Sequence, residues 1–421
     1  MKNNKLTNLI LIALVLGIVS GVVINEFMAD NAFVNDILVG SIFKIIGQIF
    51  LNAIKMLVVP LVFVSISLGV ARMGDMAKLG RIGAKTIAYY MVTTAFAIVI
   101  GLVIANLIDP GVGLDMSKLY YAETTVAESQ VSFTDTIINM VPSNVFQAFY
   151  NGDMLQIIFF AVFFGVAITS LGEKVNKLHI ILEELNDIFL QMLMLMMKFA
   201  PIAVFSLIIT AFSTLGIDAI IPVFSYVFTA IFAMIIQITL IYSVILFIIG
   251  KVNPRRFFQK MRPAMTFAFT TASSAGTLPV TKHCVEDEIG VDPEISSFVL
   301  PIGATINMDG TAIMQGAAVV FIAQAMGVDL TMADYLTVIL TATLASIGTA
   351  GVPGSGVVML SMVITQVGLP IEAVGVIMGV DRLVDMVRTV VNITGDAVCS
   401  LIIAKSENAL NLDKFNSDTN Q

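Results

Sequence analysis

Charged residues are scarce in this chain of 421 residues. Only 12% of the residues are Asp, Glu, Lys or Arg, whereas 57% are hydrophobic. A water-soluble globule could not cover its apolar side chains with so few charges. The scarcity therefore excludes a soluble fold and predicts a chain whose natural solvent is the lipid bilayer.

Cysteine and clustered basic residues are also few. The two cysteines, Cys284 and Cys399, lie far apart and outside any CxxC or Cys/His spacing, which disfavours a disulfide framework or a zinc site. The formal net charge is -8. Binding to nucleic-acid phosphates needs Lys and Arg gathered on one face, and the chain has no such pattern. We expect no nucleic-acid partner.

Motifs of membrane-embedded enzymes are missing as well. An intramembrane aspartyl protease needs a Gly-x-Gly-Asp element, but residues 393–396 read Ile-Thr-Gly-Asp. A serine peptidase needs a placed histidine, and the only two, His179 and His283, fall near predicted loops. We therefore expect that the protein is not an enzyme.

Long apolar runs occupy most of the chain. A run of about 20 residues can cross the hydrocarbon core as a helix. The first run is long enough to span, and because no small-x-small cleavage site follows it, we do not interpret it as a secretory signal. Conventional spans are predicted near residues 7–26, 40–71, 86–108, 150–172, 187–214 and 219–250, followed by two spans that contain polar residues, at 293–325 and 370–404.

The loops alternate in charge. Segments 72–85 and 251–262 are basic, whereas 26–37 and 109–133 are acidic. The positive-inside rule places the basic loops in the cytoplasm. Both termini are then predicted to be cytoplasmic, and Lys405 agrees with this for the C-terminus.

Two apolar segments are interrupted by Ser, Gly, Thr and Pro, at 270–279 and 348–356. Lipid-exposed irregular backbone is too costly, so these tips must be buried in protein or line a watery cavity. We interpret them as re-entrant helical hairpins near 255–290 and 330–366. The alternative is a straight helix packed through its small residues, which Pro279 and Pro353 disfavour. A hairpin followed by a polar span occurs twice, as in an inverted repeat.

The last span carries a polar face. Its members recur every three or four residues, so they share one side of a helix. Such a face needs partners at membrane depth. Arg388 could pair with Asp385, whereas Arg382 is expected to lie off the face, 100 degrees from Asp381. Bound cations are then the simplest source of the missing positive charge. The face comprises Asp381, Asp385, Arg388, Thr389, Asn392 and Asp396.

An acidic amino acid fits the remaining groups. The planar fork of Arg388 suits bidentate capture of a carboxylate. Asp385 can hold an ammonium, and Asn392 can donate a hydrogen bond to a second carboxylate. The N-termini of the half-helices at the hairpin tips offer free N–H groups to the same anion.

These motifs resemble the dicarboxylate/amino acid:cation symporters, which include archaeal sodium-aspartate transporters and animal excitatory amino acid transporters. The resemblance covers nearly the whole chain. Its most specific parts are Ser273–Pro279, Asn307–Thr311, Ser346–Gly356 and Asp385–Asp396. It implies a secondary active symporter that imports aspartate or glutamate with sodium ions.

The resemblance also implies the site residues. Arg388 would bind the side-chain carboxylate of the substrate and Asp385 its amino group, with the pocket completed by Ser274, Thr311, Val352, Gly356, Thr389 and Asn392. Three sodium sites are implied. The first would use Asn392, Asp396 and Gly303. The second would use Thr305, Met308, Ser346, Ile347 and Thr349. The third would use Tyr90, Thr93, Thr94, Asn307 and Asp309.

The implied architecture is an all-α membrane protein with eight transmembrane helices, two hairpins and an elevator-type mechanism. A homotrimeric scaffold would comprise 1–80 and 109–218, and the transport domain 81–108 and 219–404, followed by a cytoplasmic tail at 405–421. The protein would lie in the plasma (inner) membrane. Ala272 and Met386 occupy positions where archaeal or animal members carry an arginine, so a second guanidinium is not expected in the site.

The coupling ion is judged from two further positions. Gln315 stands where animal glutamate transporters have Glu, which disfavours potassium counter-transport. Asp396 and the Asn307–Thr311 motif are kept, which favours sodium over protons. The alternatives are a proton-coupled glutamate symporter, a carrier of another dicarboxylate-like amino acid such as cystine, and an anion channel.

Overall fold

The computed structural model describes residues 2–73, 81–116, 138–347 and 354–417. Within these ranges every regular element is a helix, apart from an isolated bridge between Val291 and Leu410. Seven helical stretches in the described part are long and apolar enough to cross a membrane. An apolar helix satisfies its backbone hydrogen bonds internally, as a bilayer requires. The prediction of an all-α membrane protein is confirmed.

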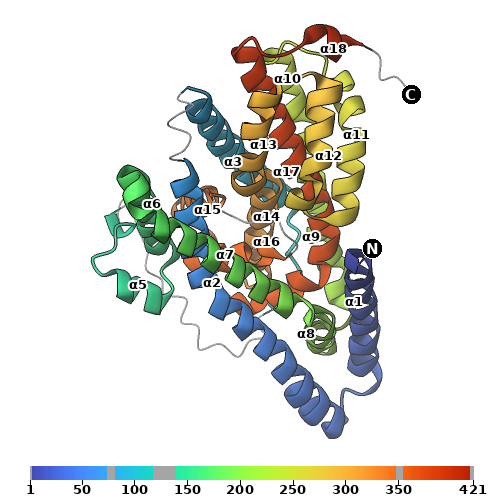
Figure 1. Ribbon diagram of the computed structural model, residues 1–421. Coiled ribbons are helices and arrows are strands. Elements are labelled where there is room, and N and C mark those ends of the chain that lie inside the picture. The colour runs from blue at the N-terminus through green and yellow to red at the C-terminus, as the bar shows by residue number, and fades with distance from the viewer. Residues whose placement is uncertain (1, 74–80, 117–137, 348–353, 418–421) are drawn as a thin grey trace.

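Apart from α3, which packs along α14 (Asp309–Ala325), the helices of the N-terminal half lie together on one side of the molecule (Figure 1). Helix α1 packs along α8, and α2 packs against α6 and α7. Large apolar side chains such as Ile12, Val19 and Phe163 are exposed on these helices, where lipid or another protein would cover them. The elements are α1 (Lys2–Phe27), η1 (Phe33–Phe43), α2 (Lys44–Met73), α3 (Arg81–Ile108), α5 (Val145–Asn151), α6 (Met154–Leu171), α7 (Asn176–Met197) and α8 (Ala200–Leu215).

The predicted single span at 187–214 is wrong. Helix α7 ends at Met197 and α8 begins at Ala200. Pro201 lies in the first turn of α8, where its missing N–H costs nothing, but in a continuous helix its ring would clash with the carbonyl of Met197. Both helices contact α2, but α8 packs mainly against α1.

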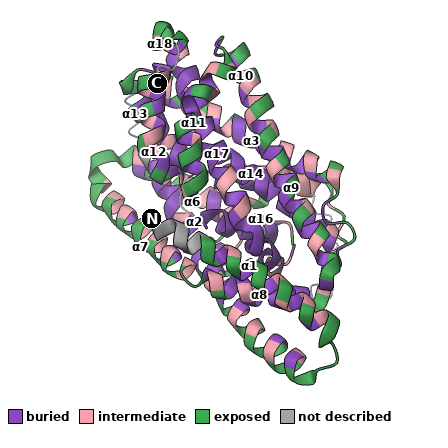
Figure 2. Cartoon of the chain, turned by 90° about the vertical axis from the view of Figure 1, so that its right-hand side faces the viewer, coloured by how far each residue is buried: buried purple, intermediate pink, exposed green. Residues whose placement is uncertain are grey.

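The C-terminal half surrounds α17, which runs through the middle of the molecule (Figure 1). Figure 2 shows α14, α16 and α17 largely buried, with α1 at the surface. The elements are α9 (Ile220–Ile236), η6 (Gln237–Tyr242), α10 (Ser243–Ile248), α11 (Pro254–Thr271), α12 (Ser274–His283), η7 (Cys284–Ile289), α13 (Pro293–Ile306), α14 (Asp309–Ala325), α15 (Met332–Ala345), α16 (Ser355–Gln366), α17 (Val374–Ser406) and α18 (Leu412–Asn416).

Two helix interruptions lie next to α17. Between α11 and α12, Ala272 adopts a left-handed conformation with φ of 49°, and the Ser273 hydroxyl caps α12 by accepting from the N–H of Gly276 at 3.1 Å. Pro279, expected to mark the break, lies inside α12. Between α13 and α14, Asn307 is extended. Residues 348–353, which include the predicted second hairpin tip, lie outside the described residues.

The start of α3 is tied by charge to Glu407, the residue that follows α17. Lys85 donates to Glu407 at 2.7 Å, and Arg81 also bonds to this carboxylate. These hydrogen bonds hold the pKa of Glu407 below its usual range. The contact fixes the start of α3 against the end of α17.

The C-terminal segment, residues 410–416, packs against α11 and the residues that follow η7. Val291 and Leu410 form a bridge, and the N–H of Asn411 donates to the carbonyl of Gly290 at 2.9 Å. The buried Lys260 ammonium donates to the carbonyls of Glu288 and Lys414 at 2.9 and 3.1 Å. These contacts join α18 to the element that precedes the first break.

Phe415→Ala is expected to lower the melting temperature in detergent. The ring is 1% exposed, so its removal leaves a cavity that costs about 3–5 kcal/mol. Leu412→Ala, on the same helix but 40% exposed, is the matched control and is expected to change little. Equal melting temperatures for the two variants would contradict the docked position of α18.

Candidate functional site

Four charged side chains of α17 form a buried cluster of alternating sign. Arg388 Nη2 donates to Asp385 Oδ1, and Arg388 Nη1 lies 3.9 Å from Asp381 Oδ1. Arg382 Nη1 donates to Asp385 Oδ2 at 3.2 Å. We call these four residues the charge cluster. With two carboxylates and two guanidinium groups it is neutral by itself.

Arg382 belongs to the charge cluster, although the sequence pattern places it off the polar face of this helix. The position of Arg382 was judged by its angle to Asp381, but its partner is Asp385, three residues further along and only about 60 degrees away around an α-helix. A long side chain spans that distance easily. Arg382 is 8% exposed, so this ion pair belongs to the interior of the bundle.

Asp309, the first residue of α14, lies in a second buried polar group. Its Oδ1 accepts from the Thr94 hydroxyl at 2.8 Å, and its Oδ2 accepts from the Tyr242 hydroxyl at 2.8 Å and the Gln237 amide at 3.3 Å. Thr93 lies beside them in α3 and donates to the carbonyl of Tyr90 at 3.3 Å. The predicted grouping of Thr93 and Thr94 with Asp309 is therefore present in the structure.

Asp396 is linked to the break between α13 and α14. The Asn307 amide donates both to Asp396 Oδ1 and to the carbonyl of Asn392, each at 2.9 Å. A Cβ atom at Gly303 would lie 2.5 Å from the Tyr90 hydroxyl and would also overlap the Asp396 carboxylate. Asn307 Oδ1 is buried and has no hydrogen-bond partner among the described residues. This oxygen atom can therefore accept a bond from a ligand or coordinate a cation.

Sequence reasoning missed Gln237 and Tyr242. They were assigned to an apolar span, in which residues five apart lie on different faces of an α-helix. Here they begin and end the π-helix η6, whose wider turn brings residues five apart closer in line. Both side chains are buried and bond to Asp309. Their polarity within residues 219–250 was the available signal.

Of the other predicted substrate residues, Thr389 and Gly356 lie against the charge cluster. Thr389 donates to the carbonyl of Asp385 at 2.9 Å. Gly356, near the start of α16, faces Arg388, because a Cβ atom there would collide with the guanidinium. Thr311 is buried one turn into α14, and Ser274 is buried at the first position of α12, which packs against α17. Val352 lies outside the described residues.

The second predicted sodium set is only partly described. Thr305 donates to the carbonyl of Ile302 at 3.0 Å, and Ser346 donates to that of Thr343 at 2.7 Å, so both hydroxyls serve their own helix ends. Met308 and Ile347 are buried. Thr349 lies outside the described residues. The grouping of this set stays a prediction.

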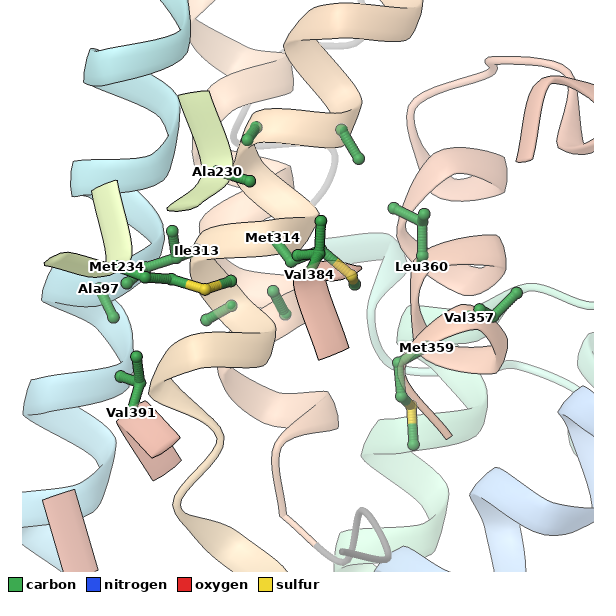
Figure 3. Packing of buried hydrophobic residues seen from close by; sticks show 14 of the residues in the cluster. Ala97, Ala230, Met234, Ile313, Met314, Val357, Met359, Leu360, Val384 and Val391 are labelled. Carbon is green, nitrogen blue, oxygen red and sulfur yellow. The ribbon is translucent and has the colours of Figure 1, made fainter. Parts of the chain in front are cut away.

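An apolar wall encloses the charged groups. Arg388 Nη1 lies 3.3 Å from the sulfur of Met314, and Figure 3 shows Met314 with Val384 in the packed interior, facing Met359 and Leu360 of α16. Such surroundings strengthen electrostatic interactions because they contain little water.

The charge cluster and the region around Asp309 and Asp396 differ in net charge. The charge cluster is neutral, whereas Asp309 and Asp396 have hydrogen-bond donors but no Lys or Arg partner within 4 Å among the described residues. A buried carboxylate without a countercharge is unfavourable. The arrangement can therefore bind cations next to a site for a charged organic molecule. This combination defines a membrane carrier.

The chain belongs to the sodium:dicarboxylate symporter family, whose model matches residues 6–406. It is therefore a multi-pass membrane transporter and not an enzyme. It is 36% identical over 411 residues to a proton/sodium-glutamate symport protein of Geobacillus stearothermophilus, covering 96% of this chain and 95% of the relative.

Two further relatives are named for different substrates. A proton/glutamate-aspartate symporter of Escherichia coli is 36% identical over 425 residues, with 98% of this chain and 96% of the relative covered. A C4-dicarboxylate transport protein of Bacillus subtilis is 33% identical over 409 residues, covering 96% and 94%.

Gly310→Ala is expected to lower the melting temperature. A Cβ atom there would lie 2.9 Å from Arg388 Cα, so α14 must move away from the α17 backbone, at a cost of about 1–3 kcal/mol. In Gly375→Ala, on α17, the added methyl meets only the flexible end of Leu207 at 3.2 Å. A Gly310→Ala protein as stable as Gly375→Ala would contradict this close approach.

Proposed function

We propose that the protein imports an acidic amino acid, aspartate or glutamate, together with sodium ions. The observation that carries the proposal is the buried pair of Arg388 and Asp385 next to two carboxylates, Asp309 and Asp396, for which the described part of the chain supplies no countercharge. Arg388 binds a substrate carboxylate through two parallel N–H donors, and Asp385 binds the ammonium. Relatives named for glutamate and aspartate support this assignment.

Sodium is favoured as the coupling ion because of the ligands around Asp309 and Asp396. A proton needs one acceptor, whereas a hard cation needs several oxygen ligands together. Carboxylates, the Thr93 and Thr94 hydroxyls, and Asn307 Oδ1 supply such oxygens. The hydrogen bonds from Tyr242 and Gln237 hold Asp309 in place for an arriving ion.

Three sodium ions per substrate account for uptake against an inside-negative potential. An acidic amino acid of charge -1 is opposed by about 2.3 kcal/mol per 100 mV. Three sodium ions make the transported set +2, which the same potential draws inward by about 4.6 kcal/mol per 100 mV. Coupling requires that the empty and partly loaded sites do not close.

The transport cycle follows from the same proposal. The units α11–α12 and α15–α16 act as re-entrant hairpins, and the second is the extracellular lid. Residues 81–108 and 219–404 move as one domain against a trimeric scaffold of 1–80 and 109–218. Both termini face the cytoplasm of a cell whose plasma membrane holds the carrier.

Arg388→Ala is expected to abolish uptake of labelled aspartate and glutamate into proteoliposomes with sodium outside. The change removes the carboxylate partner and leaves Asp381 and Asp385 without their shared countercharge. Arg262→Ala, at an exposed position of α11, is the control. Undiminished uptake by the Arg388 variant would overturn its role. Wild-type uptake that follows a proton gradient without sodium would instead favour proton coupling.

Asp396→Asn and Asp309→Asn are each expected to raise the sodium concentration needed for half-maximal uptake by about tenfold or more, because each removes one anionic ligand. Thermal stabilisation of the protein by sodium should weaken in parallel. Asp218→Asn, an exposed position, is the matched control. Wild-type sodium dependence in both site variants would refute the cation assignment.

A further inference from the structure

We propose that Arg382 determines how strongly the carrier depends on the amino group of its substrate. This inference rests on the proposed function. It assigns a specificity role to a residue outside the predicted substrate and sodium sets, and it starts from the position of Arg382 in the charge cluster.

Both oxygens of Asp385 are already engaged without substrate. Oδ1 accepts from Arg388, and Oδ2 accepts from Arg382 at 3.2 Å. An incoming ammonium must share or replace the Arg382 contact, because the carboxylate has no unengaged oxygen. Arg382 therefore competes with the substrate amino group for the same carboxylate.

The charge cluster has one donor and one acceptor that make no hydrogen bond among the described residues. Arg382 Nε and Asp381 Oδ1 are buried and have no hydrogen-bond partner among the described residues. The Arg382 guanidinium keeps its charge in any state, since arginine does not deprotonate in proteins. Among the described residues it makes one hydrogen bond, although it carries five N–H donors, so a substrate ammonium has to displace a single Arg382 contact to reach Asp385 Oδ2.

Charge balance gives the consequence for selectivity. With Arg382 the cluster is neutral, so a C4-dicarboxylate without an amino group still meets a compensated Asp385. Without Arg382 the cluster carries one net negative charge, which repels a dianion more than an amino acid of charge -1. The same change leaves one Asp385 oxygen free for an ammonium. Arg382 thus widens the range of substrates, and its loss narrows the range to amino acids.

The test compares aspartate and succinate as competitors of labelled aspartate uptake into proteoliposomes with sodium outside. In Arg382→Met the ratio of the succinate to the aspartate inhibition constant is expected to rise about tenfold or more over wild type, because close buried charge pairs couple by more than 1.4 kcal/mol. Arg382→Lys keeps the charge and is expected to restore a ratio near that of wild type.

Controls separate this role from a structural one. Arg262→Met, an exposed arginine on α11, should leave the ratio unchanged. If Arg382→Met is not monodisperse, Arg382→Gln takes its place.

The outcomes distinguish the two proposals. A wild-type protein that neither binds nor transports acidic amino acids overturns the proposed function and this inference with it. Normal wild-type uptake with an unchanged ratio in the Arg382 variants overturns this inference alone, as does a rise in the ratio that Arg382→Lys shares.

Discussion

The ion pair between Arg388 and Asp385 is the interaction on which the site depends. Both side chains are buried in a bundle whose outer face is apolar, so water cannot neutralise them. Each would be costly alone, and the pair persists because Arg382 and Asp381 continue the alternation of charge along one helix. A neutral cluster of this kind can exchange one partner for a substrate group without leaving an isolated charge.

The site also needs backbone groups that can bind a ligand, and breaks in the helices beside α17 supply them. Continuous helices offer a neighbour only side chains, whereas a break also offers carbonyls and N–H groups. At Asn307 the chain is extended, and its side chain links α17 at Asn392 and Asp396. In return, Asn392 Oδ1 accepts from the N–H of Gly310 at 2.8 Å. These contacts hold Asp309 and Asp396 on opposite sides of one junction without neutralising either.

Much of this organisation could be predicted from the sequence, for reasons that particular residues make clear. Long apolar runs mark spans because the bilayer allows little else, and the polar residues of α17 recur with helical period. Three features were not predicted, and the first two depart from an uninterrupted α-helix. Pro201 divides one apolar run into α7 and α8, the π-helix η6 brings Gln237 and Tyr242 to Asp309, and Arg382 reaches Asp385 through its length.

The separation of the two regions explains how coupling and specificity can be set independently. Arg382 and Asp381 lie in the cluster that would bind the substrate, and neither bonds to Asp309 or Asp396 among the described contacts. Changing the cluster charge by one unit alters which anion is acceptable there. In the proposed function the cations bind elsewhere, at Asp309, Asp396 and the side-chain oxygen of Asn307. One scaffold can therefore accept substrates of charge -1 or -2 while keeping its ion sites, which fits a family whose members are named for both amino acids and C4-dicarboxylates.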